Sequence, residues 1–294
     1  MRLAVSGLGK ALREFSPSKL REFKRGFVFR PNNEVAIAPL GEKLIGKVQE
    51  LSIKTADGID LNHSYYIPPA KTKNPFAIAF FHGNASPPYL LHDIVEDLVK
   101  IKDKLGIGTV MPCYRGFGGN KGIPSEKGIY EDARATVRFL KEKGVPPQNI
   151  ISWGLSLGGV PATKVANKSL IAHSTYSTYN KLMPDYLKFL QAIGQVPKPI
   201  PLLDRLKIAI VRKSPFLNLN PEKNISKLGK DTQIGIFHSK ADEVIPYKMA
   251  EDLAKASPNP KLTQLHIVED GTHRFASDKM KEDIFNFIKQ VTGR

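Results

Sequence analysis

The chain has 294 residues, with 44 Lys and Arg against 28 Asp and Glu, and therefore a formal net charge of +16. Its content of 41% apolar and 24% charged residues is ordinary for a globular protein and excludes wholesale disorder. The single cysteine, Cys113, excludes an intramolecular disulfide and a multi-cysteine zinc site. Neither a signal peptide nor an apolar run of about 20 residues is present. These features predict a cytoplasmic protein, with peripheral contact at an anionic membrane surface as an open alternative.

The excess of basic residues is concentrated in two stretches. Residues 1–30 contain eight basic and two acidic residues, and residues 181–230 contain ten basic and three acidic residues. We expect a basic rim that attracts an anionic substrate or a lipid surface, although a solvated, lysine-rich surface explains the charge equally well. The basic residues are 32 Lys and 12 Arg, without the interleaved aromatic and arginine residues that read bases. This pattern disfavours a nucleic-acid partner.

Residues 1–47 are predicted to form a basic N-terminal arm. Apolar residues recur in it at helical spacing in two groups, separated by Ser16-Pro17, which is a helix-start signal. The groups are Leu8, Leu12 and Phe15, followed by Leu20, Phe23 and Phe27. The two short helices expected here would pack on the protein's own core or lie on an anionic membrane.

Residues 48–294 are predicted to form one α/β domain. Two apolar segments flank Ala56-Asp57-Gly58 as a hairpin, and short apolar runs then alternate with helical patterns. The expected strands are 48–54, 59–67, 76–81, 108–113, 149–153, 169–172, 232–237 and 262–268, and the expected helices include 126–143, 160–167, 246–256 and 275–290. This order predicts a mostly parallel sheet with helices on both faces. Residues 175–230 interrupt the alternation, and we expect them to form a small helical lid with a proline-stiffened bend.

Gly154-Leu155-Ser156-Leu157-Gly158 follows an expected strand and precedes an expected helix. This is the strand–turn–helix context in which a G-x-S-x-G motif exposes a nucleophilic serine on a tight turn. Glycines flank the serine because side chains at those positions would collide, and the helix that follows directs its positive end at the serine. Ser156 is therefore the predicted nucleophile.

A serine nucleophile needs a general base, and the base needs an acid that orients it. His273 lies in the loop between the last expected strand and the last expected helix, where the base belongs, whereas His238 and His266 fall at strands and are expected to be structural. Asp242 follows the preceding expected strand and is the predicted acid. Glu243, one residue further on, is expected to point elsewhere.

An oxyanion formed at the attacked carbonyl group needs preorganised donors. We expect one donor to be the backbone N–H of Leu157, which directly follows the nucleophile. The second is expected to be the backbone N–H of Asn84, in the turn His82-Gly83-Asn84-Ala85 after an expected strand. His82 itself is predicted to be a buried structural residue.

Together these motifs resemble the α/β-hydrolase superfamily, in particular the serine hydrolases of the esterase, lipase and thioesterase type in its depalmitoylase-like and prolyl-oligopeptidase-like branches. The matching segments, in family order, are 81–84, 114–118, 154–158, 242–246 and 271–273. The resemblance implies a Ser-Asp-His triad and no cofactor. Ser239, where the family commonly has glycine, and Pro161, early in the helix after the nucleophile, depart from the usual pattern.

The function predicted from these residues is hydrolysis of carboxylic esters or thioesters through an acyl-enzyme, with a small-molecule, lipid or acyl substrate. Two alternatives stay open. One is a peptidase or aminoacyl hydrolase that uses the same triad, and the other is a non-catalytic basic binding module on a hydrolase scaffold. The glycines at 116–122 match a dinucleotide fingerprint only superficially, because Pro124 and Ser125 intervene before the helix. No cofactor and no metal are expected.

Overall fold

The computed structural model of the chain describes residues 16–30, 41–84, 86–213 and 219–294. Within these residues an eight-stranded sheet has the order β1-β2-β4-β3-β5-β6-β7-β8. The strands are β1 (Gln49–Lys54), β2 (Asp60–Ile67), β3 (Ala77–Phe81), β4 (Gly108–Met111), β5 (Ile150–Leu155), β6 (Ser169–His173), β7 (Gln233–Ser239) and β8 (Thr263–Val268). The leading hairpin pairs antiparallel, β2 also joins β4 antiparallel, and the remaining pairs are parallel. The predicted α/β class is confirmed.

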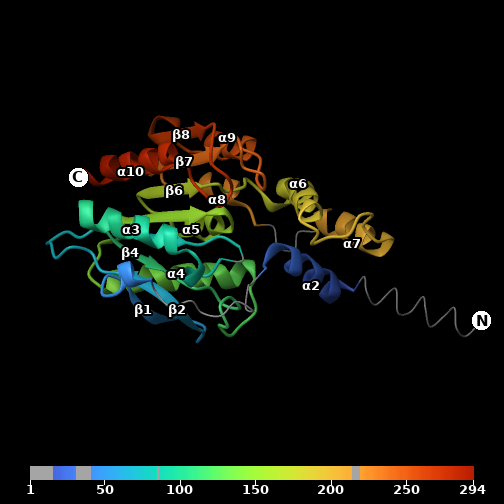
Figure 1. Cartoon of the computed structure of the whole chain (residues 1–294), viewed down its shortest axis with the longest axis horizontal. Helices are drawn as coiled ribbons and strands as arrows, with labels where there is room; N and C mark the ends of the chain where they lie inside the picture. Colours follow the sequence, from blue (N-terminus) through green and yellow to red (C-terminus); the bar gives the residue numbers. More distant parts are fainter. Residues whose placement is uncertain (1–15, 31–40, 85, 214–218) are drawn as a thin grey trace, which may run out of the picture.

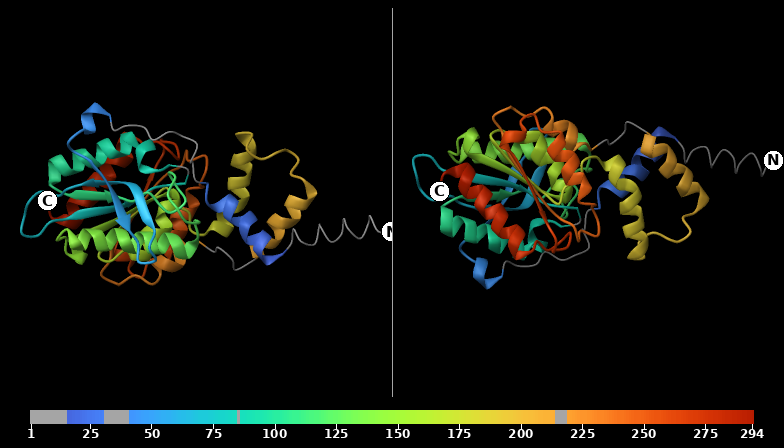
Figure 2. Two further views of the ribbon diagram at one scale, coloured as in Figure 1. Left: turned by 90° about the horizontal axis from the view of Figure 1, so that it is seen from below. Right: turned by 90° about the horizontal axis from the view of Figure 1, so that it is seen from above.

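Helices cover both faces of this sheet (Figure 2). The helices α3 (His92–Leu105) and α10 (Asp278–Thr292) lie on one face, and α4 (Glu126–Glu142), α5 (Gly159–Val165) and α9 (Lys248–Lys255) lie on the other. The short helix α8 (Pro221–Ile225) contacts α5 and α9. Neither α3 nor α8 was among the helices expected from the sequence, although α8 lies within the expected helical lid.

Each face of the sheet has its own hydrophobic core, because successive residues of a strand point to opposite faces. In β3, Ala77, Ala79 and Phe81 belong to the core under α4, α5 and α9. Ile78 and Phe80, between them, belong to the core under α3 and α10. All five side chains are buried, so β3 is a central strand from whose end a loop can be positioned rigidly.

Three helices stand together at one end of the molecule, beside the carboxyl ends of the parallel strands (Figures 1 and 2). They are α2 (Pro17–Val28), α6 (Tyr179–Ala192) and α7 (Leu202–Lys213), and we call them the cap. The helix expected around Leu20 is thus observed as α2, with Ser16 Oγ accepting a hydrogen bond from the Lys19 N–H at its start. The first apolar group, Leu8 to Phe15, lies outside the described residues.

The segment assigned to the arm is joined to the rest of the molecule. Helix α2 packs against α7, and Val28 and Phe29, at its C-terminal end, are 1% and 3% exposed within the hydrophobic core. The lid expected over 175–230 contains α6 and α7, connected by the proline-rich residues 193–201. Among the described residues, no helix has both the length and the apolar character needed to span a membrane.

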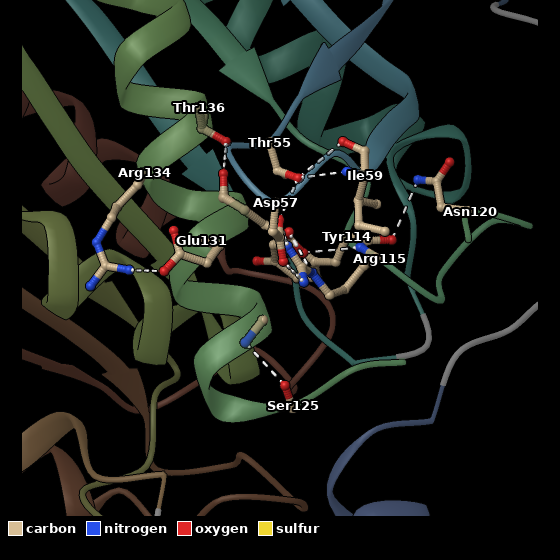
Figure 3. Close-up of polar contacts among 12 residues, drawn as sticks. Thr55, Asp57, Ile59, Tyr114, Arg115, Asn120, Ser125, Glu131, Arg134 and Thr136 are labelled. Carbon is tan, nitrogen blue, oxygen red and sulfur yellow. Dashed lines mark hydrogen bonds and ion pairs between the residues drawn. The ribbon is translucent and has the colours of Figure 1, made fainter. Parts of the chain in front are cut away.

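Arg115 joins the β1–β2 hairpin to α4 through two carboxylates (Figure 3). Its guanidinium donates to Asp57 at 2.7 and 2.9 Å and to the buried Asp132 at 2.8 Å. The hydrogen bonds from Arg115 and Thr55 hold the pKa of Asp57 well below its usual range. The network fixes the loop after β4, whose Tyr114 supports the loop after β3.

Candidate active site

Ser156 lies at the turn between β5 and α5, in the short 3₁₀ segment Ser156–Gly158. Its φ of 54° places a non-glycine residue in the left-handed region, which costs of order 1–3 kcal/mol and marks functional sites. Glycine is required on both sides of it. A Cβ atom on Gly154 would lie 2.4 Å from the Gly158 carbonyl oxygen, and one on Gly158 would lie 1.9 Å from the Phe81 carbonyl oxygen.

The next glycine, Gly159, is equally constrained. A Cβ atom there would lie 2.1 Å from Cγ2 of Thr175. The Thr175 hydroxyl lies 3.2 Å from the His173 carbonyl oxygen, 3.3 Å from that of Ser156 and 3.4 Å from that of Gly154, and it can donate to any one of them. Thr175 therefore braces the turn that carries Ser156, a contact that no local sequence signal indicated.

His273 joins the serine to a carboxylate. Its Nε2 lies 2.9 Å from Ser156 Oγ, and its Nδ1 lies 2.9 Å from Asp242 Oδ2. With the proton on Nδ1 donated to Asp242, Nε2 is free to accept the serine proton. Ser156 lies at the end of β5, Asp242 after β7 and His273 after β8. The three residues predicted as nucleophile, acid and base thus form one hydrogen-bonded chain.

The Asp242 carboxylate is completely buried. Its second oxygen, Oδ1, accepts hydrogen bonds from the backbone N–H groups of Val244 and Ile245 at 2.9 and 2.8 Å. Burial alone would raise the pKa of Asp242, but hydrogen bonds from His238 and His273 hold that pKa below its usual range. Asp242 is therefore a fixed, ionised acceptor for His273 Nδ1–H.

His238 is a further residue of this site, although the sequence indicated only a structural role for it. The ring is completely buried, and its Nε2–H can be shared between the Ile245 carbonyl oxygen at 2.9 Å and Asp242 Oδ2 at 3.2 Å. Asp242 Oδ2 consequently lies between two imidazole donors. A histidine four residues before the acid was the only sequence signal for this contact.

Glu243 does not point away from the site, contrary to expectation. Its Oε2 accepts a hydrogen bond from the backbone N–H of His273 at 3.1 Å. Ser239, the unusual residue at the end of β7, donates to the Gly271 carbonyl oxygen at 2.7 Å and accepts from Ala241 N–H at 3.0 Å. Both side chains fasten the loop of Asp242 to the loop of His273. The expectation for Glu243 was wrong because the turn at Asp242 directs both carboxylates toward the loop of His273.

The loop after β3 lies against the serine. A Cβ atom on Gly83 would lie 3.4 Å from the Cβ of Ser156, and Asn84 and Leu157 line the same cavity as Ser156. His82 is completely buried, as expected, and stacks on Tyr114 with ring centroids 3.9 Å apart. The Tyr114 hydroxyl donates to the His82 carbonyl oxygen at 3.1 Å. The two expected oxyanion donors therefore lie on loops that meet at Ser156.

A cavity of about 860 Å³ opens over Ser156 and His273. The cap provides an apolar wall, formed by Tyr179, Leu182, Tyr186, Phe189 and Leu190 of α6, with Ile193 following it and Val28 of α2. The described residues that line it include two arginines, Arg30 and Arg274, and no Asp, Glu or Lys. A second cavity, of about 620 Å³ between α3 and α10, shares Leu91 and Arg274 with this one but contains neither Ser156 nor His273. Ser156 and His273 thus both line the first cavity.

No protein-family model matches the chain. Among known proteins, the uncharacterized protein YfhR of Escherichia coli O157:H7 is 26% identical over 256 residues, which cover 82% of this chain and 80% of that protein. This relative is itself uncharacterized and indicates no activity for the chain.

Solved structures are similar to the chain over most of its length. The esterase Pf2001 of Pyrococcus furiosus superposes with a TM-score of 0.65 at 17% identity, over 89% of this chain and 97% of that one. A puromycin-hydrolyzing peptidase of Mycobacterium tuberculosis superposes with a TM-score of 0.63 at 18% identity, over 88% of this chain and 41% of that one. The chain has the α/β-hydrolase fold, as the sequence resemblance implied.

Proposed function

We propose that the protein is a serine hydrolase that cleaves carboxylic esters or thioesters through an acyl-enzyme intermediate. The observation that carries the proposal is the hydrogen-bonded chain from Ser156 Oγ through His273 to Asp242, with the serine on a strained turn. A neutral imidazole in contact with both a hydroxyl and a buried carboxylate is the arrangement that activates a serine. The similar esterase folds are consistent with hydrolysis.

In the acylation step, Ser156 Oγ attacks the substrate carbonyl carbon while its proton passes to His273 Nε2. The ionised Asp242 stabilises the resulting imidazolium through Nδ1–H. The backbone N–H groups of Leu157 and Asn84 are assigned to the oxyanion, where one such donor is worth about 3 kcal/mol of transition-state stabilisation. The tetrahedral species then expels an alcohol or thiol, which leaves with the proton from His273.

Deacylation repeats the sequence with water. His273 Nε2 takes a proton from the water that attacks the acyl-enzyme, and the new tetrahedral species collapses to release a carboxylic acid. Ser156 Oγ recovers its proton from His273, and the starting state is restored. Every proton in this cycle passes through His273, so this mechanism needs no cofactor or metal ion.

The walls of the cavity favour an acyl or lipid-like substrate. Tyr186, Phe189 and Leu190 present apolar surface to the space over Ser156, and such surface binds hydrocarbon by excluding water. The two arginines, with no Asp or Glu among the described lining residues, favour an anionic group elsewhere on the substrate. The substrate we propose therefore combines an apolar acyl chain with negative charge.

The test is labelling with a fluorophosphonate, which reacts with an activated serine. We expect labelling of the wild type and none of Ser156→Ala, with the variant retaining the wild-type unfolding temperature. A folded wild type that does not react would contradict the proposal and favour a non-catalytic binding module. Labelling that persists in Ser156→Ala would contradict the assignment of the nucleophile.

The second candidate is amide hydrolysis, which the similar fold of the puromycin-hydrolyzing peptidase raises. The same triad supports both reactions, so substrates must separate them. We expect p-nitrophenyl esters and acyl thioesters of increasing chain length to be cleaved faster than aminoacyl p-nitroanilides. A preference for the anilides would assign the protein to the peptidases.

A further inference from the structure

Helix α7 in the cap packs Ile208 toward the core but also exposes apolar residues along its outer face. Leu202, Leu206 and Ile210, spaced at i, i+4 and i+8, are 71%, 48% and 44% exposed. Lys207, by contrast, is only 8% exposed, and its ammonium lies 5.4 Å from the ring centroid of Phe23 in α2. An ordinary surface helix directs its apolar stripe inward and its lysines outward. These three apolar residues form the outward stripe of α7. Their exposure indicates that the stripe contacts another molecule.

The stripe differs from scattered surface apolar residues. Single exposed leucines are common, whereas apolar side chains aligned along one helix face mark a surface that contacts a partner or a membrane. Arg205, exposed one turn after Leu202, places a cation on the same side of the helix. The stripe therefore combines apolar side chains with positive charge.

The surrounding charge identifies the occupant. The sequences of α2 and α7 contain eight basic and two acidic residues. Such a density of cations repels a second copy of a chain that itself carries +16, which argues against a homodimer through this face. It attracts a surface of negative charge, and exposed apolar side chains flanked by Lys and Arg are the composition of helices that lie in the headgroup region of anionic membranes.

We propose that the outward stripe of α7 docks the cap onto an anionic lipid bilayer. Leu202, Leu206 and Ile210 enter the boundary between headgroups and acyl chains, while basic residues of α2 and α7 contact the lipid phosphates and carboxylates. The docking itself does not depend on the proposed hydrolase activity. If that activity is correct, docking also brings the cavity over Ser156 close to the bilayer, because the half-exposed Ile193, between α6 and α7, lines the cavity. Acyl groups held in the membrane then reach the serine.

Vesicle co-sedimentation of the full chain tests the docking. We expect binding to vesicles of 70% phosphatidylcholine and 30% phosphatidylserine to be at least about tenfold tighter than to pure phosphatidylcholine, and to weaken as salt is raised. The triple variant Leu202→Ser/Leu206→Ser/Ile210→Ser should lose about tenfold or more of this binding. Arg205→Glu should weaken it on the anionic vesicles.

A matched control removes equally exposed apolar side chains outside the cap. Ile45, Ile123 and Leu265 are 67%, 62% and 40% exposed, and Ile45→Ser/Ile123→Ser/Leu265→Ser should bind vesicles within twofold of the wild type. Hydrolysis of a short, soluble p-nitrophenyl ester by the α7 variant should also stay within twofold, because the stripe does not line the cavity. If the wild type cleaves no ester, the comparison of vesicle binding between the wild type and the variants still tests the docking, because it does not depend on hydrolysis.

Three results would overturn the proposal. Equal binding of the wild type and the α7 variant to anionic vesicles would show that the stripe does not contribute to membrane binding. Light scattering that shows a dimer of the wild type and a monomer of the α7 variant would assign the stripe to self-association. A lower unfolding temperature of the α7 variant than of the control variant would show that the stripe packs against the chain itself.

Discussion

The side chain of Asn84 holds the backbone at Arg30: Asn84 Oδ1 accepts a hydrogen bond from Arg30 N–H at 2.8 Å, and its Nδ2 donates to the Val28 carbonyl oxygen at 2.9 Å. The loop that supplies a proposed oxyanion donor is therefore fastened to the C-terminal end of α2. Val28 and Arg30 also line the cavity over Ser156. Residues from the predicted N-terminal arm thus line the cavity, in agreement with the alternative in which the arm packs on the protein's own core.

Replacing Asn84 by alanine should separate the role of its side chain, which holds residues 28–30, from that of its backbone N–H, which is proposed to bind the oxyanion. Asn84→Ala keeps the backbone N–H proposed for the oxyanion but breaks both hydrogen bonds to the segment 28–30, at a cost of about 1–2 kcal/mol in the free energy of unfolding. We expect KM for a long-chain ester to rise more than kcat falls, because the displaced residues form the cavity wall. Steady-state kinetics and denaturant unfolding provide the measurements.

Asn259→Ala is the matched control for this prediction. Asn259 also makes two hydrogen bonds to backbone groups, with Lys230 and Lys261, but it lies outside the cavity. Its replacement should leave KM and kcat within twofold of the wild type. A fall in kcat with unchanged KM in Asn84→Ala would contradict the wall role and assign the side chain to the chemical step.

His238 is expected to act as a positioning residue for Asp242. His238→Leu removes one imidazole donor from a buried, ionised carboxylate, and such hydrogen bonds are worth about 1.5–3 kcal/mol. The pKa of Asp242 should rise, since the His238 hydrogen bond helps to lower it. We expect kcat to fall about tenfold to a hundredfold, with little change in KM, because His238 is buried and does not line the cavity.

A rescuing substitution at His238 distinguishes the positioning of Asp242 from a general loss of protein stability. His238→Gln restores an N–H donor in a side chain of similar length, and it should recover most of the lost kcat. If Leu and Gln at this position reduce kcat equally while both variants remain folded, the hydrogen bond to Asp242 is not the cause.

Gly159 should not accept a side chain. In Gly159→Ala the new Cβ atom would lie 2.1 Å from Thr175 Cγ2, so the turn at Ser156 or the loop after β6 must shift. Overpacking of this kind costs about 1–3 kcal/mol, and we expect a lower unfolding temperature together with reduced labelling of Ser156. Thr175→Ala in the same chain removes the clashing methyl and hydroxyl groups and should restore part of the stability.

Gly26→Ala provides the comparison for Gly159→Ala. Nothing lies within 4 Å of a Cβ atom placed on Gly26, which is inside α2, so alanine there should stabilise the helix by up to about 1 kcal/mol. Equal effects of the two glycine substitutions on unfolding and on labelling would refute the steric argument.

The sequence was sufficient to predict candidate site residues that directly follow strands of the parallel sheet. Ser156, Asp242 and His273 each lie in a loop just after a parallel strand, and a parallel sheet brings such loops to one edge. Contacts that depend on distant segments could not be predicted in this way. The association of Phe23 in α2 with Lys207 in α7 joins residues far apart in the chain, and no pattern within either helix specifies it.

Local signals also failed in two places. Helix α3 begins at His92 after Leu91, which provides no side-chain cap, so the start signal that marks α2 and α4 is missing there. Glu243 was expected to point away because it is adjacent to Asp242, but the path of the turn, rather than sequence spacing, decides where its carboxylate lies. Side-chain directions in tight turns depend on backbone angles that the sequence does not display.

Two buried histidines should each destabilise the folded state in mild acid. Burial lowers the pKa of His82 to about 4 and that of His173 to about 3, whereas an unfolded histidine titrates near about 6.5. Between these values the unfolded chain binds protons at these two histidines that the folded chain cannot, so their contribution to the free energy of unfolding falls as the pH decreases from about 6.5. Each such group contributes at most about 1.4 kcal/mol per pH unit in this window.

His173→Leu isolates one of these contributions. The His173 Nδ1 is buried and has no hydrogen-bond partner among the described residues, so leucine removes the titrating group without breaking a bond at that atom. At pH 8, where the histidine is neutral in both states, the difference in unfolding free energy from the wild type measures only packing. Between pH 6.5 and 5 we expect the variant's stability to fall less steeply, by up to about 1.4 kcal/mol per pH unit. Parallel curves from urea unfolding across this range would contradict the low pKa of His173.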